Sequence, residues 1–189
     1  MKVNRIKKVV VVYGDQNSGK TDSLCRLCDL LIAKCTGGFI LRKAGGKAPQ
    51  AALPRNKKSG KCQDVLFAAT VKGAAGDDVT VGVGTAGDTW DAVWRNFMFF
   101  DAEMPDHQFD VVFVAIREQP RKDGLCKSEH SFPLLALEEL ECNYGMDCVQ
   151  RPFERTTVVQ KGYGGSQMAF QKQCQSVNRQ FANKLMGMI

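Results

Sequence analysis

A buried strand, a glycine-bounded loop and an amphipathic helix follow one another near the start of this 189-residue chain, and this succession constrains its fold most. Residues 7–13 hold four valines and a tyrosine without polar alternation, a pattern typical of a strand buried on both faces. Residues 21–35 space their apolar side chains as a helix does, before Gly37 and Gly38. A strand of this kind needs helices over it, so the succession predicts an α/β domain.

The loop between strand and helix fits the pattern G-x-x-x-x-G-K-[ST] at every defined position. Its residues are Gly14, Asp15, Gln16, Asn17, Ser18, Gly19, Lys20 and Thr21. Gly14 and Gly19 permit backbone conformations that a side chain hinders, so successive amides can curl around a phosphate at the helix N-terminus. Lys20 would bring a positive charge to the β- and γ-phosphates, and the Thr21 hydroxyl could ligate Mg²⁺.

Strand, loop and helix together resemble the P-loop NTPases over residues 7–35. Over residues 7–125 the chain is also similar to a group of small, poorly characterised bacterial and phage P-loop proteins. That similarity rests on the loop, a hairpin that leads to Gly87-Asp88, an aromatic helix, and a strand that ends in Ala115-Ile116-Arg117. The resemblance implies a bound nucleoside triphosphate, with Mg²⁺ as cofactor.

The rest of the chain alternates between helical and strand patterns. Strands are expected near 39–41, 64–72, 78–83, 109–116 and within 148–160, and helices over 88–103, 132–142 and 166–188. Strands 64–72 and 78–83 flank a turn and predict a hairpin. We therefore expect one domain over residues 1–189 with a three-layer P-loop NTPase fold, in which a mostly parallel sheet carries one antiparallel hairpin and helices on both faces.

A P-loop enzyme usually needs another carboxylate at the end of a neighbouring strand, where it holds Mg²⁺ through water or orients the attacking water. Asp88 is the first acid after strand 78–83, so it is a candidate metal ligand and catalytic residue; its alternative role is a helix N-cap. Arg117 follows the strand 109–116 and could stabilise transition-state charge, or it could form a surface ion pair with Glu118 or Asp123. Glu118 is the alternative metal carboxylate. Lys20, Asp88 and Arg117 are thus the candidate catalytic residues.

The base of the nucleotide is indicated only by missing motifs. The hairpin before Thr85-Ala86-Gly87 is similar to the second and third strands and the switch of small GTPases. Gly84, however, stands where that family has its metal-linked Asp, and no Asn-Lys-x-Asp motif follows to read guanine. ATP is therefore expected in preference to GTP.

Positive charge is concentrated in one part of the chain. The formal net charge is +6, and residues 30–63 contain eight bases and no acid. The bases are Lys34, Arg42, Lys43, Lys47, Arg55, Lys57, Lys58 and Lys61. Residues 44–61, rich in Gly, Pro, Ala and Lys, predict a flexible loop. The basic segment 42–61 could attract nucleic acid or an acidic partner, or could simply be a solvated surface.

Cysteine content and hydropathy indicate the compartment. The chain has eight cysteines, and its size without an export signal favours reduced thiols in the cytoplasm. Cys25 and Cys28 form C-x-x-C inside the expected helix, which is more typical of a core stripe than of a zinc or redox site.

The longest strongly apolar run, 9–13, is far shorter than the ~20 residues of a membrane span. The Met-rich end of the last helix is available for an oligomer contact.

These observations favour a Mg²⁺-dependent P-loop NTPase, a hydrolase that binds ATP and releases its γ-phosphate. Two alternatives remain open at this point. One is a phosphotransferase of the nucleotide-kinase type, in which basic residues clamp an acceptor phosphate. The other is a nucleotide-gated module that binds nucleic acid or a protein through the 42–61 segment.

Overall fold

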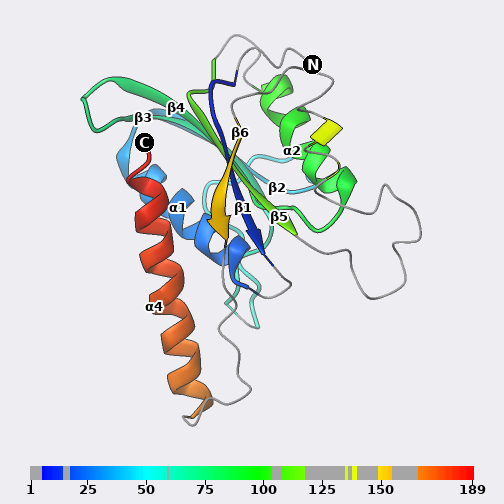
Figure 1. Cartoon of the computed structure of the whole chain (residues 1–189), viewed down its shortest axis with the longest axis vertical. Coiled ribbons are helices and arrows are strands. Elements are labelled where there is room, and N and C mark those ends of the chain that lie inside the picture. Colours follow the sequence, from blue (N-terminus) through cyan, green and yellow to red (C-terminus); the bar gives the residue numbers. More distant parts are fainter. Residues whose placement is uncertain are drawn as a thin grey trace.

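The structure is a computed structural model that describes residues 6–14, 18–58, 60–103, 108–117, 135, 138–139, 149–154 and 166–189. The elements in chain order are β1 (Val9–Gly14), α1 (Lys20–Lys34), β2 (Cys35–Lys43), β3 (Val65–Lys72), β4 (Asp78–Gly84), α2 (Trp90–Glu103), β5 (Val111–Arg117), β6 (Val149–Glu154) and α4 (Gln167–Met186) (Figure 1). The predicted helix 132–142 lies largely outside the described residues.

The strands form one mixed sheet in the order β2-β3-β4-β5-β1-β6. β5 pairs parallel with both β4 and β1, and β1 pairs parallel with β6. β3 pairs antiparallel with both of its neighbours, β2 and β4. The hairpin predicted over residues 64–83 is present as β3–β4, with Leu66 opposite Gly84 and Lys72 opposite Asp78.

The predicted three-layer P-loop NTPase fold with a mostly parallel sheet is wrong, because antiparallel pairing extends from β2 through β4. Residues 39–41 were expected to be a short strand, but β2 begins directly after α1 and runs for nine residues. Gly37 and Gly38, expected to end the helix, lie within this strand. β2 ends at the same end of the sheet at which β3 begins, so the connection 44–64 does not cross the sheet. A parallel pair of strands would need a crossover connection.

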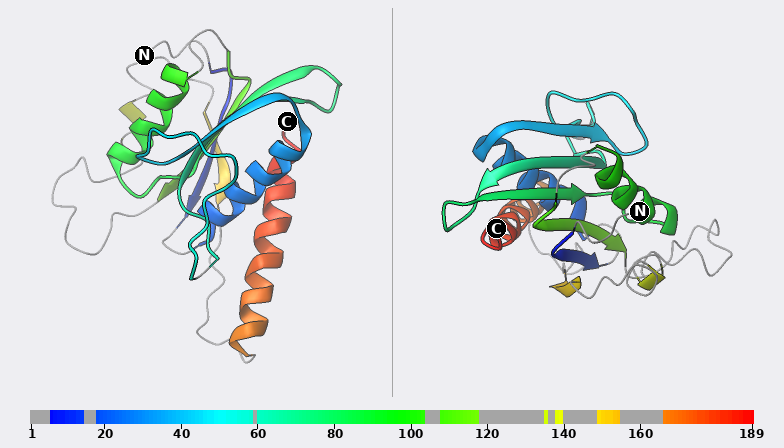
Figure 2. Two further views of the ribbon diagram at one scale, coloured as in Figure 1. Left: turned by 180° about the vertical axis from the view of Figure 1, so that it is seen from behind. Right: turned by 90° about the horizontal axis from the view of Figure 1, so that it is seen from above.

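Apolar side chains alternate between the two faces of the sheet, which explains why the strands look uniformly apolar. From β1, Val10 and Val12 join one core cluster, whereas Val9 and Val11 join the other. The first cluster contains side chains of α1 and α4, and the second contains side chains of α2. The views in Figure 2 agree, since α1 and α4 lie on one side of the sheet and α2 on the other.

The helix predicted at the C-terminal end is confirmed as α4, and only its second half packs on the core. Ala182 and Leu185 are fully buried, whereas Met168 near the start is 67% exposed. Figure 1 shows the first turns of α4 extending beyond the sheet. Met186 and Met188, which the sequence left available for an oligomer contact, pack against the core cluster around α1. Within the described ranges, no helix combines the length and apolar character that crossing a membrane requires.

Asp110, directly before β5, links β4 to the residues before β1 at the edge of the sheet opposite the glycine loop. Its carboxylate accepts hydrogen bonds from the Lys7 ammonium at 2.6 Å and from the Thr80 amide at 2.8 Å. Partial burial alone would raise the pKa of Asp110, but these two hydrogen bonds outweigh it and lower the pKa. A carboxyl with a lowered pKa stabilises the fold above its unfolded pKa, and this stabilisation is lost as the pH falls through its folded pKa.

Asp110→Asn should therefore lower the free energy of unfolding by about 1 kcal/mol at pH 7, with a shrinking difference below about pH 4. Urea unfolding at several pH values measures this. The control is Asp78→Asn, which alters an exposed pair with Lys72 (2.9 Å) and should cost at most a few tenths of a kcal/mol. Equal losses in the two variants, or a loss for Asp110→Asn that persists at low pH, would contradict the role given to Asp110.

Candidate functional site

The glycine loop lies at the edge of the sheet where several chemically useful residues meet. β1, β4 and β5 run parallel, so Gly14, Gly84 and Arg117 end their strands at this edge. β3 runs the opposite way, so it begins there, directly after Asp64. β2 is antiparallel to β3 and therefore ends there with Lys43. The mixed sheet thus brings the start of one strand to the ends of four others.

Lys20 is held over the glycine loop. Its ammonium donates to the Gly14 carbonyl at 2.7 Å and lies 3.4 Å from the Ser18 hydroxyl, and the side chain is only 8% exposed. Gly19 precedes it with φ of +87°, a left-handed conformation that side chains rarely adopt. Asp15, Gln16 and Asn17, predicted to bind phosphate, lie outside the described residues. Gly14, Ser18, Gly19, Lys20 and Thr21 are brought together as expected.

The N-terminus of α1 has the character of an anion site. Gly19 is its N-cap residue and supplies no side-chain hydrogen bond to the first amides of the helix. Those amides carry the positive end of the helix dipole and, in most helices, need an outside acceptor. The Lys20 side chain begins at this end of the helix and adds a full positive charge there.

Asn178 of α4 supports this loop from behind. A Cβ built on Gly19 would lie 2.6 Å from the Asn178 Oδ1 atom, so the two residues are in close contact. The Asn178 amide also donates to Asp22 in the first turn of α1 at 2.8 Å, and Arg26 bonds the same Asp22 oxygen at 2.9 Å. The sequence carries no signal for this contact, because Asn178 and Asp22 are 156 positions apart.

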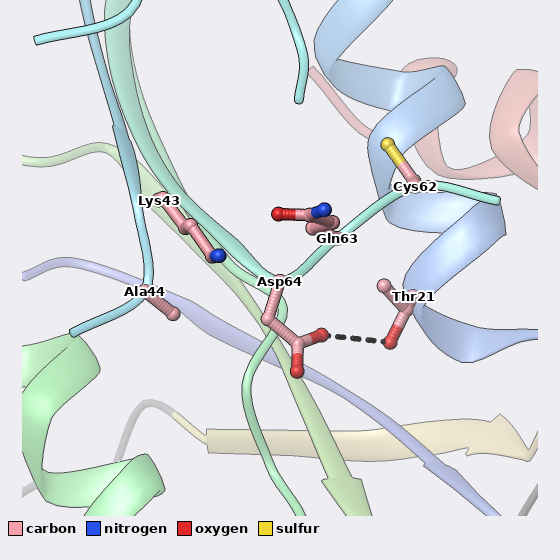
Figure 3. Close-up of a pocket in the computed structure, with 6 residues that line it drawn as sticks. All are labelled: Thr21, Lys43, Ala44, Cys62, Gln63 and Asp64. Atoms are coloured by element: carbon pink, nitrogen blue, oxygen red, sulfur yellow. Dashed lines mark hydrogen bonds between the residues drawn. The ribbon is translucent and has the colours of Figure 1, made fainter. Parts of the chain in front are cut away.

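Asp64 is the acidic residue that sequence analysis missed. The Thr21 hydroxyl donates to its Oδ1 atom at 3.1 Å (Figure 3), and the Thr85 hydroxyl lies 3.3 Å from the same atom. Thr85 is itself fixed, since its hydroxyl accepts the Val65 amide at 2.7 Å. The sequence pattern pointed to a metal carboxylate at the end of a strand, whereas Asp64 comes directly before one. The predicted hairpin already implied that the residue before β3 reaches the same edge.

The electrostatic surroundings of Asp64 oppose its charge. Removal of its carboxyl from water by surrounding protein raises the pKa, and the nearby Asp88 charge adds to the rise. Hydrogen bonds from Thr21 and Thr85 and the charge of Lys20 act in the opposite direction without cancelling it. Part of the side chain still faces solvent, so the rise is modest in energy. Two carboxylates that repel each other favour a cation between them.

Asp88 is exposed beside this cluster, and its expected alternative role as N-cap of α2 is wrong. The Thr89 hydroxyl, and not Asp88, accepts the Ala92 amide at 3.2 Å. Gly87 fixes where Asp88 lies, because its carbonyl accepts the Arg117 amide at 2.9 Å. A Cβ on Gly87 would stand 1.7 Å from the Ala115 carbonyl oxygen, so only glycine fits there.

Arg117 lies between the glycine loop and the segment that carries Asp88. It is paired in register with Gly14 on the neighbouring strand, and its side chain is 4% exposed. The ion-pair alternative stays a prediction, because Glu118 and Asp123 are not among the described residues. Glu118, the other carboxylate considered for the metal, lies outside the described residues.

An open pocket of about 500 Å³ adjoins the Thr21–Asp64 pair. It is lined by Thr21, Lys43, Ala44, Cys62, Gln63 and Asp64 (Figure 3). The exposed Lys43 side chain and the Asp64 carboxylate both line it. The pocket therefore combines a cation, a carboxylate and amide groups, which suits a polar or anionic ligand next to the loop.

The chain by itself offers an incomplete metal site. In the part of the chain that the structure describes, no group of three or more His, Cys, Asp or Glu side chains is arranged to hold a metal ion. Thr21 and Asp64 nevertheless provide a hydroxyl and a carboxylate oxygen 3.1 Å apart, with Asp88 nearby. Mg²⁺ commonly takes one or two protein oxygens and completes its shell with phosphate and water. These residues therefore fit Mg²⁺ bound together with a nucleotide.

Cys25 and Cys62 are in contact beside the pocket, and Cys62 is one of the residues that line it. The thiols of Cys25 and Cys62 share a hydrogen bond that raises the pKa of Cys25, with burial adding to the rise. The same bond lowers the pKa of Cys62. The Cys25 sulfur also lies 3.8 Å from the Gln63 carbonyl oxygen. Cys25 and Cys28 are both buried in the core, as the stripe predicted.

Comparison with known proteins finds no matching family model, no similar curated protein and no similar solved structure. The residues at the edge of the sheet that carries the glycine loop are therefore the basis for a function.

The contact at Gly87 yields a direct test of how the site is built. Gly87→Ala should push the 85–88 segment off β5 and lower the free energy of unfolding by roughly 1–3 kcal/mol. Gly38→Ala is the matched control, because a Cβ there meets nothing within 4 Å, and it should change stability by no more than about 0.5 kcal/mol. Thermal and urea unfolding measure both. If Gly87→Ala were as stable as the native chain, the segment would not lie against β5 as described.

Proposed function

We propose that this protein binds a nucleoside triphosphate with Mg²⁺ at the glycine loop and hydrolyses its γ-phosphate. The observation that carries the proposal is the buried Lys20 ammonium, held 2.7 Å from the Gly14 carbonyl at the N-terminus of α1. A largely buried ammonium at a helix N-terminus is well placed to form a charge-assisted contact with a phosphate. Thr21, the residue of α1 that follows Lys20, donates a hydrogen bond to the Asp64 carboxylate.

Each residue has a role in this proposal. The backbone amides of residues 15–20 would surround the phosphates, and Lys20 would leave Gly14 to contact the β- and γ-phosphates. Thr21 and Asp64 would hold the metal, and Asp88 would take a position next to it. Mg²⁺ supplies neutralisation of phosphate charge when it is bound. Arg117, beside Gly14, would stabilise the charge that develops during phosphoryl transfer.

The nucleotide and the compartment are part of the proposal. ATP is preferred to GTP because the guanine-reading motif is missing from the sequence. A cytoplasmic, reducing compartment is supported by the described cysteines, which are free thiols.

A second candidate function is phosphoryl transfer to an acceptor, and the pocket beside Asp64 favours it. The Lys43 ammonium faces this pocket, and a nucleoside monophosphate there would stand next to the proposed metal residues. Phosphate release measured with and without nucleoside monophosphates separates transfer from hydrolysis. The third interpretation, a nucleotide-gated binding module, remains a prediction. Its basis is the exposure of Lys43, Lys47, Arg55, Lys57, Lys58 and Lys61 in the basic segment.

Nucleotide affinity tests the role of Lys20. Lys20→Ala should weaken binding of Mg·ATP at least tenfold, because a charge-assisted contact to phosphate contributes about 1.5–3 kcal/mol. Lys34→Ala, at the exposed far end of the same helix, is the control and should bind as the native chain does. Isothermal titration calorimetry on folded variants measures this. Equal affinity of the Lys20 variant and the native chain would refute binding at the loop.

Catalysis tests the two carboxylates separately. Asp88→Asn should lower the rate of phosphate release by about 10²-fold while leaving nucleotide affinity within a few fold. Asp64→Asn should raise the Mg²⁺ concentration needed for half-maximal activity. Asp91→Asn, an exposed carboxylate one turn along on α2, should change neither quantity. Unchanged turnover in the Asp88 variant would remove it from the reaction, and an unchanged Mg²⁺ requirement in the Asp64 variant would remove Asp64 from the metal site.

A further inference from the structure

The Cys25 sulfur lies 3.8 Å from the Gln63 carbonyl oxygen, and the neighbouring Cys62 packs against the core cluster that contains Cys25. This contact lies close to the Thr21–Asp64 hydrogen bond. Thr21 and Cys25 are four positions apart on α1 and therefore share one face of that helix. Cys62 and Asp64 are two positions apart directly before β3; Asp64 bonds Thr21 of α1, and Cys62 packs against the core cluster that contains side chains of α1. The two contacts consequently form successive links between α1 and the segment directly before β3.

The two thiols differ in their access to solvent. Cys25 is fully buried, while Cys62 is half-buried and lines the open pocket beside α1 (Figure 3). A small oxidant that enters the pocket therefore reaches Cys62 first. Cys25 belongs to the buried core cluster against which Cys62 packs.

We propose that Cys25 and Cys62 are a peroxide-sensitive pair, whose oxidation to a disulfide cross-links α1 to the segment that carries Asp64. The Cys62 sulfur attacks a hydrogen peroxide oxygen, which breaks the O–O bond, forms a sulfenic acid and releases water. The Cys25 sulfur then attacks the Cys62 sulfur, and the sulfenic oxygen leaves as a second water. Two thiols thus lose two electrons and two protons in total, and the peroxide is reduced to two waters.

The consequence for the site rests on the proposed function. The disulfide would fix residues 62–64 against α1, so the Asp64 carboxylate could no longer adjust when metal and nucleotide bind beside Thr21. Oxidation should therefore weaken Mg·ATP binding at least threefold, and a thiol reductant should restore it. Reversible cross-links of this kind are the usual form of disulfide in a reducing compartment.

The sequence makes the pair easy to map in the full chain. Cleavage after Lys and Arg places Cys25 in residues 21–26, Cys28 in 27–34 and Cys62 in 62–72. After brief treatment with hydrogen peroxide and alkylation of remaining thiols, mass spectrometry should find 21–26 joined to 62–72 with a loss of two hydrogens. The cross-link should raise the unfolding temperature by roughly 5–10 °C, because it joins residues 37 positions apart.

Variants provide the controls. Cys62→Ser should abolish the cross-link and the response of nucleotide affinity to peroxide, and Cys25→Ser should do the same where it folds. Cys174→Ser, on α4, should retain both. A cross-link from 27–34 to 62–72, or sulfinic acid at Cys62 without any cross-link, would refute the proposal that Cys25 and Cys62 form the disulfide.

The chemical and regulatory parts can fail separately. If the cross-link forms while Mg·ATP affinity stays the same, the regulatory effect is overturned and the modification site stands. If the reduced protein binds no nucleotide at all, the proposed function fails, and the peptide map alone decides the disulfide.

Discussion

The hydrogen bond between Thr21 and Asp64 joins the two parts from which this site is built. Thr21 belongs to the strand–loop–helix unit on the parallel part of the sheet, whereas Asp64 begins the antiparallel hairpin. Thr85 holds Asp64 from the other side and is itself fixed by Val65. Because the hairpin reverses direction, an acid before one strand meets the polar ends of others. A parallel strand at the same place would have carried Asp64 to the far edge.

Close packing then fixes the remaining groups around this link. Gly87 lets the backbone approach β5, where its carbonyl accepts the Arg117 amide, so Asp88 follows directly after a fixed point beside Arg117. Asn178 presses on Gly19 from α4 and bonds Asp22, so the last helix supports the loop although it lies far away in the sequence. The site therefore combines local pattern with contacts between distant segments.

The elements of the site that depend on neighbouring residues were predictable from the sequence, whereas the contacts between distant segments were not. The strand at residues 9–14, the loop and α1 follow from an apolar run, a glycine pattern and helical spacing, each set by nearby residues. The length and direction of β2 were missed, because Gly37 and Gly38 look like a helix end and only sheet pairing draws them into a strand. Asp64 was recoverable from the predicted hairpin. Asn178 and the Cys25–Cys62 contact depend on packing between elements, for which one sequence carries no periodic signal.

The pocket and the cysteine pair place further chemistry on the same side of the loop. Lys43, Gln63 and Cys62 all line the space next to Asp64, so the proposed acceptor, oxidant and metal residues would share one opening. In the proposed mechanism, a change at Cys62 would therefore reach the metal residues without a large motion. The basic segment 42–61 borders that opening and would add attraction for anions.

A structure of the full chain with Mg²⁺ and a non-hydrolysable ATP analogue tests the central claim most directly. The account predicts that the Lys20 ammonium leaves the Gly14 carbonyl for the phosphates, while the Thr21 hydroxyl exchanges Asp64 for the metal. A nucleotide bound elsewhere, with Lys20 still on Gly14 and Thr21 still on Asp64, would contradict it.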